Sequence, residues 1–240
     1  MQRRVFVQIT AAGVASLALS PWAVAADNTP PEGFVALFNG KDFTNWKVPE
    51  GDNGHWKVVN GIIDYDGKSE ARGSKDLWTE KEFADFILMV DWRWSGPIRK
   101  AKHPIVFPDG THQKDAQGRD VLVEVDEAGD SGIYLRGSTK AQVNLWCWTC
   151  GSGEVYGYRM DPRMPPEIRA GVTPKRNADK PIGQWNSMKI TMKGDRLTVV
   201  LNDYEVISNA QLPGVPPKGR IGLQHHGDPV QFKNIYIREL

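Results

Sequence analysis

The feature that most constrains the fold is a long succession of short strand-like runs separated by turn-forming residues. From Phe34 onward, apolar and β-branched runs alternate with Gly, Asn, Asp and Pro, and no segment has a sustained helical period with caps. Gly194-Asp195 and Asn202-Asp203 are good hairpin turns. The 240 residues suffice for one large β domain. We therefore predict an all-β protein, either a sandwich or a barrel.

The N-terminus has the features of an export signal. Arg3-Arg4 precede an apolar run from Val5 to Leu19, and Ala23-Val24-Ala25 supplies a small-x-small cleavage pattern. The run is too short and too rich in small residues for a membrane span. We predict a signal peptide over residues 1–26 and a periplasmic or secreted protein. The twin arginines resemble a twin-arginine signal, although Gln8 replaces its usual Lys and ordinary Sec export stays open.

The charge balance gives no sign of a polyanionic partner. The chain has 30 basic and 29 acidic residues, a net charge of +1, and no basic cluster long enough to follow a nucleic acid. We expect no nucleic-acid partner and no stable membrane span after signal removal.

The segment from Gln142 to Trp148 separates a polar-aromatic face from an apolar one. Because alternate residues of a strand point to opposite faces, one face carries the set Gln142, Asn144, Trp146 and Trp148, and the other carries Val143, Leu145 and Cys147. A second predicted strand, Glu154–Arg159, adds the row Glu154, Tyr156 and Tyr158. Aromatic rings cover the C–H surface of a sugar while amides and charges bind its hydroxyls. The pattern favours carbohydrate contact, against outer aromatics that only pack under loops.

Two long connections, Gly96 to Asp120 and Met160 to Gly183, flank these strands. Structureless connections of this length are usually functional loops or disordered insertions. We predict that they form the walls of a binding cleft.

Cys147 and Cys150 form a Cys-x-x-Cys motif. A zinc site needs further ligands, and a thioredoxin-like site needs a helix N-terminus in a βαβ setting. In an exported chain the simplest prediction is a local disulfide that pins a strand end.

An ordered series of motifs resembles the 3-keto-disaccharide hydrolase domain family across Gly33 to Leu240. The motifs are Leu37-Phe38-Asn39-Gly40-Lys41-Asp42 with Trp46, Asp130-Ser131-Gly132-Ile133-Tyr134-Leu135-Arg136, Gly183-Gln184-Trp185-Asn186, Ile221-Gly222-Leu223-Gln224-His225-His226-Gly227 and Phe232-Lys233-Asn234-Ile235-Tyr236-Ile237. The resemblance implies a domain over residues 33–240 with a jelly-roll sandwich similar to concanavalin A-like lectins and glucanases.

The resemblance also implies a reaction on glycosides already oxidised to a ketone at C3. The ketone acidifies the C2 hydrogen, a base removes it, the C1 substituent leaves, and water adds afterwards. Such chemistry needs a base near C2 and an electrophile at the C3 oxygen, and a divalent cation is one way to stabilise the enolate.

The chain departs from the family pattern at two positions. Gln142 stands where many members have a glutamate, and an amide accepts no proton as a base. Asp130 replaces the usual Asn before Ser-Gly. A subfamily with relocated carboxylates is one interpretation, and a non-catalytic carbohydrate-binding protein is the other.

Several side chains are candidates for the chemistry. Glu154 lies between glycines that would let a ligand approach, so it is the first candidate for the base. Glu124 and Asp126 share one strand face, where they would share a cation, divide an acid and a base role, or lie as surface carboxylates. Arg136 would grip substrate or form a structural ion pair with Glu124 or Asp130. Asp130 is a further catalytic candidate.

The paired histidines separate by the same alternation. Ile221 and Leu223 face the core, which puts His225 on their side and Gln224 and His226 on the other. Gln224 is therefore a substrate-binding candidate. His226 would polarise the keto oxygen, bind sugar hydroxyls or join Glu124 and Asp126 as a metal ligand.

Three functions follow from the sequence. The first is an exported enzyme that cleaves 3-keto-glycosides or disaccharides. The second is a lectin-like binding protein, and the third is a structural or partner-binding sandwich.

Overall fold

A computed structural model describes residues 28–240, so the predicted signal peptide lies outside the described residues. The strands are β1 Val35–Ala36, β2 Trp46–Lys47, β3 Trp56–Val59, β4 Ile62–Tyr65, β5 Leu77–Phe83, β6 Phe86–Trp94, β7 Arg99–Pro104, β8 Leu122–Glu127, β9 Asp130–Leu135, β10 Ser138–Trp146, β11 Asn186–Lys193, β12 Arg196–Leu201, β13 Tyr204–Gln211, β14 Gly219–Leu223 and β15 Val230–Glu239. Two short helices follow β10: α1 Tyr156–Arg159 and α2 Pro166–Gly171.

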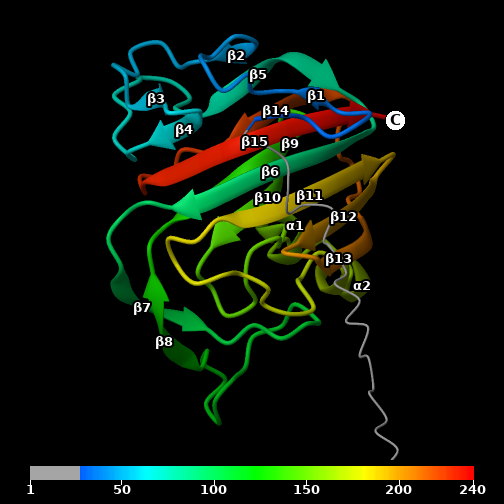
Figure 1. Ribbon diagram of the computed structural model, residues 1–240. Coiled ribbons are helices and arrows are strands. Elements are labelled where there is room, and N and C mark those ends of the chain that lie inside the picture. Colours follow the sequence, from blue (N-terminus) through cyan, green and yellow to red (C-terminus); the bar gives the residue numbers. More distant parts are fainter. Residues whose placement is uncertain (1–27) are drawn as a thin grey trace, which may run out of the picture.

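The strands form two large sheets and a small hairpin. The eight-stranded sheet has the order β13-β12-β11-β6-β15-β4-β3, with β1 paired to β15, and the five-stranded sheet has the order β10-β9-β14-β5-β2. In Figure 1 the eight-stranded sheet lies in front of β9, β10 and β14, and the β7–β8 hairpin extends beyond them. The part of the chain that the structure describes is therefore an open β-sandwich, as predicted, and not a barrel.

The core lies between the two sheets and follows the alternation of the strands. On β6, Phe86, Leu88, Val90, Trp92 and Trp94 are all buried. They join one apolar cluster with the inward residues of the opposite sheet: Ile133, Leu135, Val143 and Leu145. The two predicted hairpin turns are confirmed, since Lys193 pairs with Arg196 and Leu201 with Tyr204 across them.

Three local predictions are wrong. The segment Glu154–Arg159 is no strand, because Tyr156–Arg159 forms α1 against β10. The connection from Gly96 to Asp120 is not structureless, because its first part is β7, which pairs with β8. Cys147 and Cys150 are both free, so the predicted disulfide is absent from the structure. No helix within residues 28–240 is long and apolar enough to cross a membrane.

Candidate functional site

The outer face of the five-stranded sheet carries an aromatic-amide row built in register across four strands. Trp78 of β5 pairs with Gly222 of β14, which pairs with Tyr134 of β9, which pairs with Gln142 of β10. The rings of Trp78 and Tyr134 stack with centroids 5.2 Å apart and planes at 11°. Gly222 makes this stack possible, because a Cβ there would lie 2.7 Å from the Trp78 ring. The row presents the partly exposed ring of Trp78 beside the Gln142 amide, with Tyr134 buried under the stack, and a flat ring beside an amide suits carbohydrate contact.

A second row of side chains lies on the same face, two residues further along the same strands. Gln224 follows β14, and its main chain is held by a 2.9 Å hydrogen bond from its N–H to the Gly132 carbonyl. The Gln142 Nε2 donates to the Gln224 Oε1, so the two amides form one unit. Gly132 leaves room for this unit, because a Cβ there would overlap the Gln142 side chain. Asn144, opposite Gly132, is buried.

Asp130 lies at the end of this face as a half-buried carboxylate. Burial raises the pKa of its carboxyl to about 6, the positive charge of His226 opposes that rise, and the negative charges of Asp228 and Glu127 add to it. The Asp130 main-chain N–H donates to the Asp228 Oδ2 over 3.0 Å. The carboxyl thus changes charge close to neutral pH.

A network of charged side chains supports this end of the face. Arg99 of β7 bonds the Glu127 Oε1 through its Nε at 3.0 Å and the Asp228 Oδ1 through its Nη1 at 3.0 Å. His103 contacts the other oxygen of Glu127. Arg99 therefore ties the β7–β8 hairpin to the loop that carries His226. No local sequence pattern indicated these residues, because they come together only through that hairpin.

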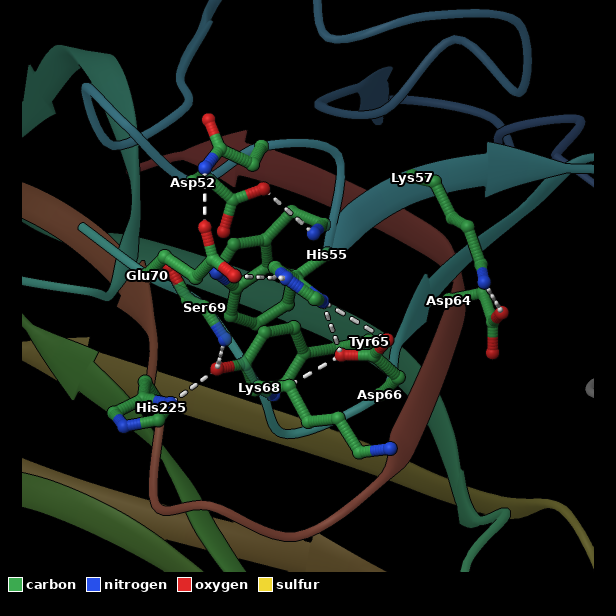
Figure 2. Close-up of polar contacts among 12 residues, drawn as sticks. Asp52, His55, Lys57, Asp64, Tyr65, Asp66, Lys68, Ser69, Glu70 and His225 are labelled. Carbon is green, nitrogen blue, oxygen red and sulfur yellow. Dashed lines mark hydrogen bonds and ion pairs between the residues drawn. The ribbon is translucent and has the colours of Figure 1, made fainter.

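The two histidines lie apart, as their alternation predicts. His226 is exposed on the side of Asp130. His225 contacts the hydroxyl of Tyr65, whose ring stacks on Trp56 at 3.8 Å. Figure 2 shows this Tyr65–His225 contact, with Ser69 donating its main-chain N–H to the same hydroxyl over 3.3 Å. His225 therefore anchors the sandwich, while His226 remains accessible.

The predicted aromatic row of β10 is a stacked cluster. The rings of Trp146 and Trp148 stack at 4.5 Å and 8°, and Tyr156 meets both edge-on. His103 stacks on Trp148 at 5.0 Å. Tyr158, in contrast, is buried in the core. The cluster borders Asp130, which pairs with Trp146 across β9 and β10.

Glu154 does not lie on an accessible face. Its carboxylate is fully buried and accepts a hydrogen bond from the Nε of Arg159, which is also fully buried. Burial raises the pKa of the Glu154 carboxyl, and the charge of Arg159 counteracts that rise. The second oxygen of Glu154 accepts a 3.4 Å contact from the Cys150 thiol. This sealed pair does not fit the predicted role of Glu154 as the proton-abstracting base.

Arg136 does not reach a ligand. It is 2% exposed, and its guanidinium donates to the carbonyls of Ala84, Gly194 and Pro216. It also forms a 2.8 Å ion pair with Asp85. Of the two interpretations of this residue, the structural ion pair is the one found, although the partner is neither Glu124 nor Asp130.

The predicted metal ligands are not gathered into one site. Glu124 and Asp126 are exposed on β8, and Asp126 forms a 2.7 Å ion pair with Lys100. Within residues 28–240, no group of three or more His, Cys, Asp and Glu side chains is arranged to hold a metal ion. The combination of Glu124, Asp126 and His226 therefore does not fit a cation site.

A ring beside amides in register on one sheet suits contact with a sugar, whose C–H faces are apolar and whose hydroxyls form hydrogen bonds. The model of the 3-keto-alpha-glucoside-1,2-lyase-like domain matches residues 33–238, and the chain belongs to this family. This membership confirms the resemblance seen in the sequence and the prediction of a carbohydrate-active enzyme.

Individual relatives agree with the family match. A protein of Bacteroides thetaiotaomicron named 3-keto-disaccharide hydrolase is 24% identical over 247 residues, covering 87% of this chain and 79% of the relative. A crystal structure of a Parabacteroides distasonis protein, named "putative glycosyl hydrolase", superposes with a TM-score of 0.60 and 22% identity over 90% of this chain and 100% of that protein. A second such structure from the same organism gives a TM-score of 0.55 and 21% identity over 98% and 100%. At this identity the structures show a shared fold.

Proposed function

We propose that this protein is an exported enzyme that cleaves 3-keto-glycosides, with Asp130 as the proton-abstracting base. The observation that carries the proposal is a half-buried carboxyl with a pKa of about 6 beside the aromatic-amide face, on which Trp78, Gln142 and Gln224 are partly exposed. A general base is most effective when its pKa lies near the working pH. The family membership supports the substrate class.

The reaction follows from the acidity that a C3 ketone gives to the C2 hydrogen. Ionised Asp130 takes the C2 proton, and the electron pair left at C2 delocalises onto the C3 oxygen as an enolate. Re-formation of the ketone makes a C1–C2 double bond and expels the C1 substituent, which takes up a proton. Water then adds to the double bond, with its hydroxyl going to C1 and its proton to C2.

The neighbouring side chains have binding roles in this proposal. Trp78, whose ring is held by its stack on buried Tyr134, contacts the C–H face of a sugar, and the Gln142–Gln224 pair binds its hydroxyls. His226 lies near Asp130 and donates to the developing negative charge at the C3 oxygen. Many family members have a carboxylate at the position of Gln142. In this proposal Asp130, on the neighbouring strand, takes the role of that carboxylate.

The fold and the cell compartment belong to the same proposal. The open sandwich supports the concanavalin A-like jelly-roll assignment. The signal-like residues 1–26 support export to the periplasm or the medium. Mass spectrometry of the secreted protein tests export, because we expect a mature N-terminus near Asp27.

The direct test is incubation of the purified protein with a 3-keto-glucoside while aglycone release is followed. We expect release with the protein as purified, and parallel reactions with Mg²⁺, Mn²⁺ or a chelator measure any dependence on a cation. Absence of release under every condition would overturn the enzyme assignment for this substrate class.

The second candidate function is carbohydrate binding without turnover. It is favoured by Gln142, because an amide at this position orients a hydroxyl but takes no proton. Binding of glycans to the aromatic-amide face, combined with no aglycone release, would support it over the enzyme.

A further inference from the structure

A cavity of about 580 Å³ lies at the end of the sandwich where β6 and β10 finish. It is bordered by the ends of these strands, by β8 and by the loop 177–182. This volume lies within the range of small-molecule sites. Asp130, His226, Tyr134, Gln142 and Gln224 are not among its lining residues, so the aromatic-amide face does not account for it.

The walls of the cavity are mainly aromatic. Four tryptophans line it: Trp92, Trp94, Trp146 and Trp148. Trp92 and Trp94 meet edge-to-face at 5.4 Å and 74°, while Trp146 and Trp148 stack in parallel. Broad indole surfaces match the C–H faces of a sugar ring, which combines apolar faces with a polar rim.

Two of the lining side chains have polar atoms without hydrogen-bond partners. The Trp92 Nε1 and the Asp179 Oδ1 are both buried and unpaired. The other oxygen of Asp179 accepts a 2.8 Å hydrogen bond from the Ser152 N–H, which fixes the carboxylate. Burial also raises the pKa of the Asp179 carboxyl. Buried polar atoms in folded proteins normally have a partner, so these two side chains mark where a group bound in the cavity would find hydrogen-bonding atoms.

The unpaired atoms select the chemistry of that group. An indole N–H only donates, and a carboxylate oxygen only accepts. A hydroxyl does both, so it is suited to either atom. A purely apolar ligand would leave both atoms unpaired, and an ammonium group would leave the indole N–H without an acceptor.

We propose that this cavity is a second carbohydrate site, which binds an unoxidised pyranose ring between the tryptophans and the Asp179 carboxylate. The site goes beyond the proposed reaction, because its residues call for hydroxyls and not for a C3 ketone. It gives the protein affinity for unmodified glycosides that Asp130 does not turn over.

Isothermal titration calorimetry and tryptophan fluorescence with methyl glucoside and maltose test this site on the full mature protein. Ile98 lines the mouth of the cavity and is 60% exposed, so Ile98→Arg should block entry without disturbing the core. Leu122→Arg is the matched control, because Leu122 is 52% exposed at the β7–β8 hairpin and does not line the cavity.

We expect binding by the wild type and by Leu122→Arg, and at least tenfold weaker binding by Ile98→Arg. Asp179→Asn should weaken affinity about tenfold, because it replaces a charged acceptor by an amide. Asp130→Asn should bind as the wild type does, which separates this site from the proposed reaction. The proposal is overturned if the wild type binds neither sugar at millimolar concentrations, or if Ile98→Arg binds as well as Leu122→Arg.

Discussion

Asp130 and Glu154 are two carboxylates whose pKa values burial raises, yet their surroundings differ in kind. Glu154 is fully buried against the guanidinium of Arg159, which is equally buried. Asp130 is half-buried, and burial raises its pKa to about 6. A fully buried ion pair has a structural role, and forming it costs the desolvation free energy of both charges. An accessible acid with a pKa near neutrality is suited to proton transfer. Access to solvent, more than the shift in pKa, separates the two roles.

The largest effect expected is on turnover in Asp130→Asn. The amide keeps the shape of the side chain but accepts no proton, so turnover of a 3-keto-glucoside should fall about 10²–10⁴-fold, as for other positioned bases. Asp126→Asn is the matched control, because Asp126 is exposed on β8 and should leave turnover unchanged. Equal turnover in the wild type and Asp130→Asn would contradict the assignment.

Glu154→Gln should act on stability. It leaves the buried Arg159 guanidinium without its counter-charge, which costs about 3–5 kcal/mol of unfolding free energy. Urea denaturation measures this loss, and Glu124→Gln on the exposed face of β8 should stay within about 0.5 kcal/mol of the wild type. If Glu154→Gln kept its stability but lost turnover, the base would have to be reassigned to Glu154 and the comparison would be reversed.

Gly132→Ala tests the amide pair on the accessible face. The added methyl would displace Gln142 and break its bond to Gln224. We expect KM to rise about tenfold with a smaller change in kcat, the scale of one lost hydrogen bond in a binding site. Gly73→Ala is the control, because a Cβ at Gly73 meets nothing within 4 Å. An unchanged KM in Gly132→Ala would remove the amide pair from the binding site.

The smallest effect should be that of reducing agents. Cys147 and Cys150 are free, and burial raises the pKa of both thiols, so both should be unreactive in the folded protein. We expect the thermal unfolding midpoint to be the same with and without dithiothreitol, and two thiols to titrate after denaturation. Detection of no free thiols in denaturant would restore the disulfide predicted from the sequence.

Alternation along the strands predicted the main features of the fold from sequence. It separated Gln142 and Asn144 from the core residues Val143 and Leu145, and Gln224 from His225. The hairpin turns were also predictable from the sequence, because Asn202 and Asp203 are residue types that tolerate the positive φ such turns need, and both adopt it.

The environment of Glu154 could not be predicted from the sequence in the same way. The glycines beside it indicate close approach, but a sequence does not name the approaching group. In the structure a Cβ on Gly151 would lie 2.8 Å from Asn177, and one on Gly153 would lie 2.9 Å from Val206. The permissive backbone therefore accommodates the protein's own chain and not a ligand.

The environment of Arg136 could not be predicted from the sequence either. Its burial depends on the carbonyls of Ala84, Gly194 and Pro216, which come from distant parts of the chain. Trp78 was missed for a similar reason, because its stacking on Tyr134 requires the register of β5, β14 and β9. Contacts that depend on how the sheets assemble leave no local signal.

Ionisation of Asp130 also makes the free energy of unfolding depend on pH. Its folded pKa of about 6 is above the ordinary value of 3.8, so the stabilising effect of the protonated acid is present at pH 3 and is lost as pH rises through 6. Stability and activity should therefore change in opposite directions between about pH 4 and 6, since the base works only when ionised.

The pH dependence of kcat/KM on a 3-keto-glucoside tests the central claim most directly. For the wild type we predict an acidic limb with an apparent pKa near 6, set by Asp130, and above this limb a plateau that continues to pH 7.5. In Asp130→Asn the residual rate should lack that limb, while Asp126→Asn should keep it. An acidic limb that persists unchanged in Asp130→Asn would contradict the account, because another group would then be the base.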